Sequence, residues 1–275
     1  MTKPGKDNPY IDIAKIIDER NSKALNKLPG FVVKWIAKVI MQNEMNRILG
    51  KYSDYSGADF LKKIIEEFNL RIVVEGKENL TENGKCIFVA NHPFGVIDGL
   101  VLTHTVSEKY GSLKAISNDS FMFLPQLRPL IAAVNVFERS SKEYVKTLED
   151  TFNLEIPITH FPAGEVSRLY NGKVQDAAWQ KSFIAKAISS KRDIVPFYFY
   201  GRNSRLFYTV FKVRHWFGIG VNIELLLLPR EMFKKRNKTI KVKIGKRIPY
   251  QMFDDSLSHW RWAQKVRSHV YELAN

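Results

Sequence analysis

The sequence has 275 residues, of which 45% are hydrophobic and 26% charged, as in a globular protein and unlike a disordered chain. Its single cysteine, Cys86, excludes an internal disulfide and any zinc site built from several thiolates. The formal net charge of +15 lies mainly in residues 201–275, which hold sixteen Lys and Arg against five Asp and Glu. Such a charge attracts a polyanionic partner, which could be nucleic acid, anionic lipid headgroups or an acidic carrier protein.

Residues 1–69 are predicted to form an N-terminal helical segment. Within residues 28–49, large apolar residues such as Phe31 and Trp35 recur at helical spacing, with Lys34 and Lys38 on the opposite face. This pattern suits a helix lying in a membrane interface, and a helix packed on its own domain is the alternative. The apolar stretch is broken by both lysines and falls short of the ~20 residues that cross a bilayer, so neither a spanning helix nor a signal peptide is predicted.

From residue 70 onward, short apolar runs alternate with helical stretches. This alternation predicts an α/β domain over residues 70–275, with a mixed, mostly parallel sheet covered by helices. A mixed sheet is expected because the strand candidates 221–228 and 239–248 have no clear helix between them. A basic helix is predicted at the end of the chain. Strands are predicted at 70–74, 86–90, 132–137, 156–160, 194–200, 221–228 and 239–248, and helices near 99–109, 140–153, 174–189 and 256–273.

The most informative motif is Ala-Asn-His-Pro-Phe-Gly-Val-Ile-Asp-Gly, residues 90–99. It follows a buried strand and precedes a helix, which is where open α/β sheets place their sites. A turn at Pro93 and Gly95 would bring Asp98 back to His92. A carboxylate on one imidazole nitrogen leaves the other free to take a proton from a hydroxyl. The alternative is an ordinary loop histidine with Asp98 as a helix cap, and residue types alone favour it.

Three later motifs follow apolar strands in the same way. His-Phe-Pro-Ala-Gly-Glu-Val-Ser-Arg (160–168) places Gly164, Glu165 and Arg168 where they could hold a polar headgroup, or form a surface turn with an ion pair. Val-Phe-Glu-Arg-Ser-Ser (136–141) places Arg139 at the start of a helix, as an anion site or a cap. Ile-Val-Pro-Phe (194–197) carries no chemistry of its own.

The order and spacing of these four motifs resemble the glycerolipid acyltransferase superfamily, which includes the lysophosphatidic-acid acyltransferases. The resemblance spans about residues 70–200. Asn91, His92 and Asp98 are similar to the first block of the family, and 136–139 to the second. Residues 161–165 are similar to the third block and 195–196 to the fourth.

The resemblance implies a reaction and a set of roles. His92 would deprotonate the acceptor hydroxyl and Asp98 would orient it. The acceptor would be bound by Asn91, Arg139, Gly164, Glu165 and Arg168. The donor would be an acyl thioester of acyl carrier protein or coenzyme A, with no metal and no other cofactor. Residues 70–275 would then be the catalytic domain.

Two departures from the usual pattern look like the hemolysin-like branch of this superfamily. Five residues rather than four separate His92 from Asp98, and Ala163 stands where the third-block glutamate usually precedes the glycine. This branch includes enzymes that O-acylate lyso-aminolipids such as lyso-ornithine or lyso-glycine lipid. The resemblance therefore implies a lysolipid acceptor, either a lyso-aminolipid or lysophosphatidate.

An acceptor with a long acyl chain resides in a bilayer. We therefore expect a peripheral protein on the cytoplasmic face of the inner membrane, contacting anionic lipid. The segment 31–40, the aromatic and basic run 197–217 and the basic C-terminal quarter would supply that contact.

Two other functions also fit parts of the sequence. A metal-dependent hydrolase could use His92, Asp98, His104 and His160 as ligands, although their spacing matches no common ligand motif. A non-enzymatic membrane- or nucleic-acid-binding module could use clusters such as 234–238 to contact phosphates. No recognised nucleic-acid motif is present, so no nucleic-acid partner is expected.

Overall fold

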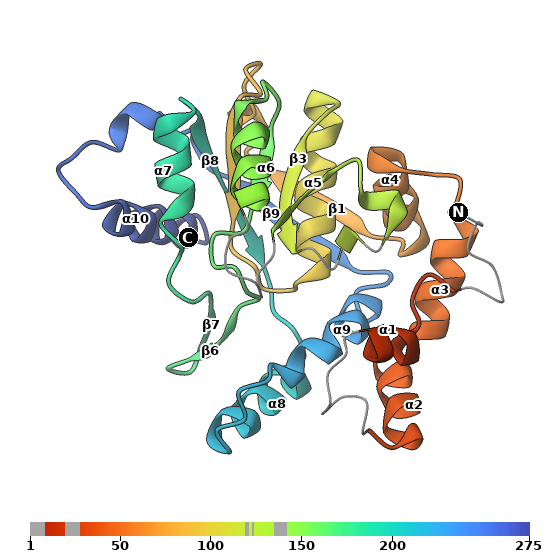
Figure 1. The fold of residues 1–275 in the computed structure, drawn as a ribbon. Coiled ribbons are helices and arrows are strands. Elements are labelled where there is room, and N and C mark those ends of the chain that lie inside the picture. The colour runs from red at the N-terminus through yellow and green to blue at the C-terminus, as the bar shows by residue number, and fades with distance from the viewer. Residues whose placement is uncertain (1–8, 20–27, 119–120, 123, 135–141) are drawn as a thin grey trace.

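A seven-stranded β-sheet forms the centre of the molecule (Figure 1). The structure is a computed structural model that describes residues 9–19, 28–118, 121–122, 124–134 and 142–275. The strands of the sheet are β1 (Arg71–Glu75), β2 (Cys86–Ala90), β3 (Lys114–Asn118), β4 (Ile131–Val134), β5 (Ile158–His160), β8 (Asp193–Tyr200) and β9 (Thr239–Ile244). They lie in the order β1-β9-β8-β2-β5-β3-β4. Five are parallel, and β1 and β9 run together in the opposite direction because β8 and β9 pair antiparallel.

The helices surround this sheet, and a small hairpin lies outside it. The helices are α1 (Ile13–Glu19), α2 (Gly30–Val39), α3 (Gln42–Lys51), α4 (Gly57–Glu67), α5 (Val96–Tyr110), α6 (Lys142–Asn153), α7 (Ser182–Ser189), α8 (Arg205–Trp216), α9 (Leu228–Phe233) and α10 (His259–Glu272). The hairpin pairs β6 (Arg168–Tyr170) with β7 (Lys173–Gln175), and short 3₁₀ turns include η3 (Pro125–Leu127), η4 (Ile223–Leu227) and η5 (Tyr250–Met252).

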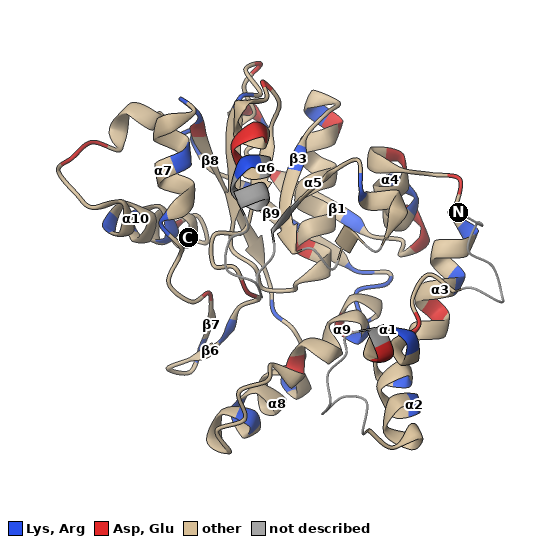
Figure 2. Cartoon of the chain, in the orientation of Figure 1, with Lys and Arg blue, Asp and Glu red and all other residues tan. Residues whose placement is uncertain are grey.

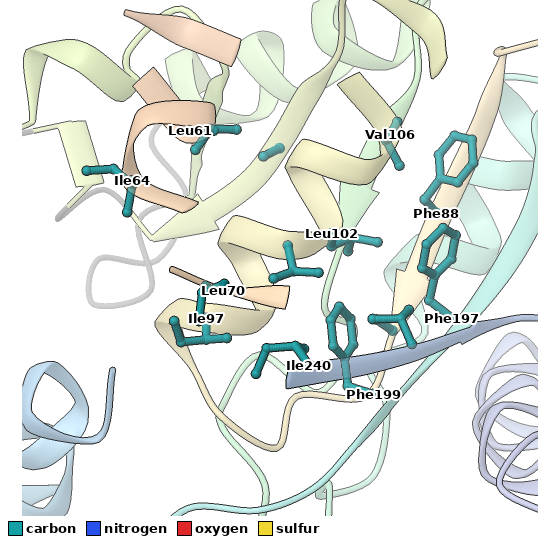
Figure 3. Close-up of a cluster of buried hydrophobic side chains, with 14 of the residues drawn as sticks. Leu61, Ile64, Leu70, Phe88, Ile97, Leu102, Val106, Phe197, Phe199 and Ile240 are labelled. Carbon is teal, nitrogen blue, oxygen red and sulfur yellow. The ribbon is translucent and has the colours of Figure 1, made fainter. Parts of the chain in front are cut away.

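The two faces of the sheet are covered by different helices. Successive side chains of a strand point to opposite faces. Along β2, Phe88 and Ala90 pack with α3, α4 and α5, whereas Ile87 and Val89 pack with α6, α7 and α10. Figure 3 shows part of the first cluster, where side chains of α4 and α5 meet those of the strands. Because both faces are covered, all five residues of β2 are buried, which explains its unbroken apolar sequence.

The N-terminal segment divides into a packed part and an exposed part. The amphipathic stretch predicted over 28–49 is two helices, α2 and α3, separated by Met41 at a φ of +56°. Ile48 of α3 and Phe60 of α4 join the core of the domain. In contrast, α2 has no buried residue, and its Phe31 and Trp35 are exposed.

The predicted α/β fold with a mixed, mostly parallel sheet is confirmed. Strands β1, β2, β5, β8 and β9 overlap their predicted ranges, as does β4 within its described residues, and the predicted helices are present as α5, α6, α7 and α10. Other details were wrong. The strand β3, the hairpin β6–β7 and the helices α8 and α9 were not predicted. The helix predicted over 174–189 begins only at Ser182, and the apolar run 221–228 is no strand.

The run 221–228 illustrates why its sequence was misleading. Its β-branched residues suggested a buried strand, but Glu224 in the middle is buried in ion pairs and the residues before it are exposed. The segment forms η4 and enters α9, where Pro229 occupies the first turn. Among the described residues, no helix combines the length and the apolarity needed to cross a bilayer.

Candidate active site

The turn between β2 and α5 brings His92 and Asp98 together. The Nδ1 atom of His92 lies 3.0 Å from Oδ2 of Asp98, and the same oxygen accepts hydrogen bonds from the N–H groups of Phe94 (2.7 Å) and Gly95 (2.9 Å). Gly95 adopts a φ of +86°, which lets the chain reverse within the motif. One oxygen of Asp98 therefore both caps the start of α5 and contacts the imidazole of His92.

The surroundings of this pair affect the pKa of Asp98 and the orientation of the His92 ring. Asp98 is fully buried, and this burial raises the pKa of its carboxyl, whereas the hydrogen bonds from His92, Phe94 and Gly95 act in the opposite direction. When Nδ1–H donates to Asp98, Nε2 is left as the free acceptor of the ring. The ring of Phe161 stacks on the imidazole, with the centroids 4.0 Å apart and 24° between the planes. The imidazole is thus held on one edge and one face.

The third sequence motif packs directly against this turn. The N–H of Ser167 donates to the carbonyl oxygen of His92 over 2.8 Å, and the hydroxyl of Ser167 donates to Oδ1 of Asp176 over 2.5 Å. The N–H of His92 donates to the same Oδ1 over 3.1 Å. The backbone of His92 is therefore held at both its N–H and its C=O.

Asp176 was not singled out by the sequence, yet it connects several parts of this site. It is buried, and its Oδ2 accepts from Nε1 of Trp179 over 2.9 Å. Its backbone N–H donates to the hydroxyl of Tyr271 (2.8 Å), and its carbonyl accepts from Arg267 (2.7 Å). Asp176 follows β7 in the loop before α7 and belongs to no motif, so only the folded chain shows that it lies beside His92.

An apolar cavity of about 280 Å³ opens at His92. The ring of His92 and the stacked ring of Phe161 line it, and it extends between α3, α4, α5 and the ends of β3 and β4. Among the described residues that line it, almost all are aliphatic or aromatic, and His92, Thr103, Ser117 and Thr159 are those with polar side chains. Its lining suits a hydrocarbon chain whose polar end lies at His92.

The structure places the other predicted site residues in three different situations. Asn91 faces away from the cavity, because its side-chain amide pairs with the backbone N–H (2.7 Å) and C=O (3.1 Å) of Phe199 on β8. Arg168 is 1% exposed, and its guanidinium contacts Glu224. Arg139 lies outside the described residues.

Gly164 and Glu165 remain near the site on the turn that follows Phe161. Gly164 is exposed at a φ of +70°, and its N–H already donates to the carbonyl of Phe161 (3.0 Å). Glu165 is half-buried, and Tyr170 donates to its carboxylate over 3.3 Å. Of the described residues predicted to bind the acceptor, these two are the ones that are not buried.

Of the four residues considered as metal ligands, His92 and Asp98 are in contact, but His104 and His160 do not complete a metal site with them. His104 pairs with Glu108 on the same helix at 3.4 Å, and burial lowers the pKa of His160 to about 4. In the described part of the chain, no three His, Cys, Asp or Glu side chains are arranged as a metal site.

The comparisons with known proteins identify the class of enzyme to which this fold belongs. The acyltransferase family matches residues 15–275, and the chain belongs to this family. The resemblance inferred from the four motifs is thus confirmed, and the protein is an acyltransferase.

Individual relatives narrow the comparison. The chain is 40% identical over 264 residues to the lyso-glycine lipid O-acyltransferase of Bacteroides thetaiotaomicron, covering 96% of this chain and 97% of that protein. It is 39% identical to the lyso-glycine lipid O-acyltransferase of Phocaeicola vulgatus, covering 96% and 95%. Among solved structures, the 1-acyl-sn-glycerophosphate acyltransferase PlsC from Thermotoga maritima matches with 17% identity and a TM-score of 0.44, over 87% of this chain and 93% of that one.

Proposed function

We propose that this protein transfers a fatty acyl group from a thioester to the hydroxyl of a lysolipid, with His92 as the general base and Asp98 as the residue that orients it. The observation that carries this proposal is the 3.0 Å contact between His92 Nδ1 and Asp98 Oδ2 beside an apolar cavity that His92 lines. It supplies a base with one free nitrogen and a place for the acyl chain next to that nitrogen.

The reaction proceeds through a tetrahedral intermediate. Nε2 of His92 takes the proton of the acceptor hydroxyl as the hydroxyl oxygen attacks the thioester carbonyl carbon. The carboxylate of Asp98 stabilises the imidazolium that forms. When the intermediate collapses, the carbon–sulfur bond breaks, the imidazolium returns its proton to the departing thiolate, and an ester and a thiol are released. This step requires no metal and no cofactor other than the thioester itself.

The apolar cavity holds the acyl chain of the donor. A saturated chain offers only apolar surface, which suits the lining by α3, α4 and α5. With the chain inserted, the thioester carbonyl lies at the His92 end, where the acceptor hydroxyl arrives from outside. The thiol carrier, either acyl carrier protein or coenzyme A, then remains outside the cavity, beside the strongly basic surface of the chain.

The acceptor is proposed to be a lyso-aminolipid, with lyso-glycine lipid as the first candidate. Support comes from the two relatives of about 40% identity over nearly the whole chain, which are lyso-glycine lipid O-acyltransferases. Gly164 and Glu165 lie on the accessible turn beside His92 and are proposed to contact the headgroup, together with Arg139. Arg168 and Asn91 are proposed to hold the site in place without touching the acceptor, since their side chains bind Glu224 and the backbone of Phe199.

The enzyme is proposed to work at the cytoplasmic face of the inner membrane as a peripheral protein. The exposed Phe31 and Trp35 lie one helical turn apart on α2, so they share one side of this helix. Lys34 and Lys38, also one turn apart and exposed, supply cations for anionic lipid headgroups.

The test is a direct assay of acyl transfer by the purified protein. Acyl carrier protein and coenzyme A thioesters serve as donors, and lyso-glycine lipid, lyso-ornithine lipid and lysophosphatidate as acceptors. We expect an ester product with at least one donor and a preference for lyso-glycine lipid. A preference for lysophosphatidate would contradict the proposed acceptor, and no ester from any pair would contradict the proposed function.

A further inference from the structure

The chain between α8 and η4 exposes a continuous apolar stretch. Residues 216–223 read Trp-Phe-Gly-Ile-Gly-Val-Asn-Ile and include no charged residue. All eight are exposed, and the exposed fractions of the five large apolar residues are 81% for Trp216, 65% for Phe217, 42% for Ile219, 71% for Val221 and 37% for Ile223. Soluble proteins rarely expose so many contiguous apolar side chains without a partner. We call residues 216–223 the apolar tip.

The aromatic and basic run 197–217, which was expected to contact a membrane, contains both buried and exposed aromatic residues. Phe207, Tyr208 and Phe211 on the first turns of α8 are buried, and they pack against the hairpin and the third-motif turn. Trp216 and Phe217 at the far end are exposed, with their ring centroids 4.8 Å apart. One end of α8 therefore anchors the element in the protein, and the other presents bare apolar side chains.

The apolar tip has a defined conformation. The N–H groups of Phe217, Gly218 and Ile219 donate to carbonyls of the last turn of α8 over 3.0–3.1 Å, and Arg214 Nη1 donates to the carbonyl of Ile219 over 2.9 Å. Arg214 is in turn held by Glu224, at 2.9 Å between Nε and Oε2. The exposed side chains thus project from a built turn, so docking them would require little ordering of the backbone.

A buried ionic cluster joins this element to the active site. Glu224 is fully buried between Arg214 and Arg168, and Arg168 Nε donates to its Oε1 over 3.1 Å. The guanidinium of Arg168 also donates to the carbonyl of Val166, next to Ser167, whose N–H binds the His92 carbonyl. Because buried charges are costly unless paired, this cluster fixes the position of the apolar tip relative to the catalytic turn.

Charge and position identify the surface that the apolar tip would meet. Helix α2, with its exposed Trp35 and Lys34, packs beside η4, and both α2 and α8 project from the same side of the molecule (Figure 1). In Figure 2 the ribbons of both helices carry Lys or Arg positions, coloured blue, and Lys212 on α8 is exposed. Tryptophan and phenylalanine flanked by cations suit the interface of an anionic bilayer.

We propose that the apolar tip inserts into an anionic bilayer surface, as a second membrane contact beside α2. Residues Leu228, Pro229 and Met232, which follow η4 directly, line the cavity, so insertion here would hold the cavity close to the lipid that contains the acceptor. The inference rests on the proposed lipid acceptor for its purpose, but its test does not depend on acyl transfer.

The test compares vesicle binding of the full-length wild type with that of a W216S/F217S/V221S variant. These side chains are exposed, so the variant should fold, and its melting temperature checks this. On vesicles of phosphatidylcholine with phosphatidylglycerol, we expect the variant to partition at least about tenfold more weakly. A W260S/M252S variant is the matched control, because Trp260 and Met252 are 53% and 54% exposed near α10, apart from α8 in Figure 1. It should bind as the wild type does.

Equal binding of the tip variant and the wild type would overturn the proposal. So would a wild-type dimer that the tip substitutions dissociate without changing vesicle binding, because the apolar tip would then be a protein interface. Acyl transfer to acceptor below its critical micelle concentration separates this proposal from the proposed function. With this dispersed acceptor, the tip variant should be as active as the wild type. If the wild type itself showed no transferase activity, that result would contradict the proposed acyl transfer and not the membrane contact.

Discussion

The carboxylate of Asp176 binds the backbone N–H of His92, a residue 84 positions earlier in the chain, and the hydroxyl of Ser167 at the same oxygen. A second oxygen binds Trp179 Nε1. This one side chain therefore joins the two motifs that bear the candidate active site. Its three hydrogen bonds are all made inside the protein, where an unpaired donor costs about 1–3 kcal/mol.

Replacing Asp176 by Asn should displace His92 without unfolding the protein. Asn has one oxygen, so its amide group must face either Trp179 Nε1 or the His92 and Ser167 donors. We expect a loss of stability of about 1–3 kcal/mol and a fall in kcat of about tenfold or more. Thermal melting and initial rates of acyl transfer measure the two effects.

A double-mutant cycle gives the control for this substitution. Trp179→Phe removes the donor that would clash with the amide group introduced by Asp176→Asn. The Trp179→Phe change should therefore cost less stability in the Asp176→Asn protein than in the wild type. If the losses of stability caused by the two substitutions simply add, the role assigned to the hydrogen bond between Trp179 and Asp176 is contradicted.

Replacing Asp98 by Asn tests the orientation of His92. The remaining oxygen can still accept from Phe94 and Gly95, so the turn should form. The amide cannot serve as the carboxylate partner of the imidazole, and we expect kcat to fall on the order of 10²- to 10⁴-fold with little change in the melting temperature. A variant within a factor of two of wild-type kcat would show that Asp98 only caps the helix.

Two positions on α5 should control the length of the acyl chain. Gly99 and Thr103 both line the cavity and lie about 6 Å apart along the helix. A side chain added at Gly99 meets open space. Gly99→Leu should narrow the cavity near His92 and reduce kcat/KM for all but short acyl thioesters, whereas Thr103→Leu should exclude only longer chains.

Gly99→Ala is the matched control for this series. It adds one methyl group and removes a helical glycine, so it should keep the chain-length preference and raise stability by up to about 1 kcal/mol. Chain-length profiles that are identical in all three variants would mean that the acyl chain lies elsewhere.

Stability at low pH should depend on Glu67. Hydrogen bonds from Arg47 and Lys51 lower the pKa of Glu67 to about 2 from an ordinary 4.5. A carboxyl whose pKa is lowered by folding stabilises the protein fully at pH values above its pKa in the unfolded chain. This stabilisation is lost as the pH falls to its pKa in the folded protein and below. Glu67→Gln should therefore cost about 1 kcal/mol at pH 7, since its cationic partners are half exposed, and almost nothing near pH 2.

Denaturant unfolding of both proteins across this pH range measures the effect. Glu66→Gln is the control, because the exposed Glu66 pairs with Lys63 on the same helix and should matter by less than about 0.5 kcal/mol at any pH. A Glu67→Gln cost that stays constant from pH 7 to pH 2 would contradict the assigned pKa.

The sequence predicted the parts of the fold and site that depend on local pattern. Strand β2 is an unbroken apolar run because both of its faces are covered, so its predicted and observed ranges agree. The turn after β2 was predictable because Gly95 and Pro93 mark a chain reversal within a few residues. Asp98 was expected to meet His92 for the same reason, and the structure places these two residues in contact.

What the sequence did not predict depends on contacts distant along the chain. Asp176 belongs to no motif, and only the packing of the β7–α7 loop places it under His92. Arg168 was assigned to the headgroup because it stands in the third motif, but Glu224, 56 residues later, binds its guanidinium inside the protein. The run that was predicted as a strand near Val221 has apolar residues that face outward, and a pattern of residue types cannot tell an outward face from a buried one.

The initial rate of acyl transfer by His92→Ala tests the central claim most directly. The donor and the acceptor are those preferred by the wild type. His269→Ala is the control, since the His269 side chain is partly exposed on α10 and pairs with Glu272 on the same helix. We predict that His92→Ala folds and loses at least about 10²-fold in kcat, while His269→Ala keeps the wild-type rate. A folded His92→Ala protein with wild-type activity would contradict the assignment of His92 as the base.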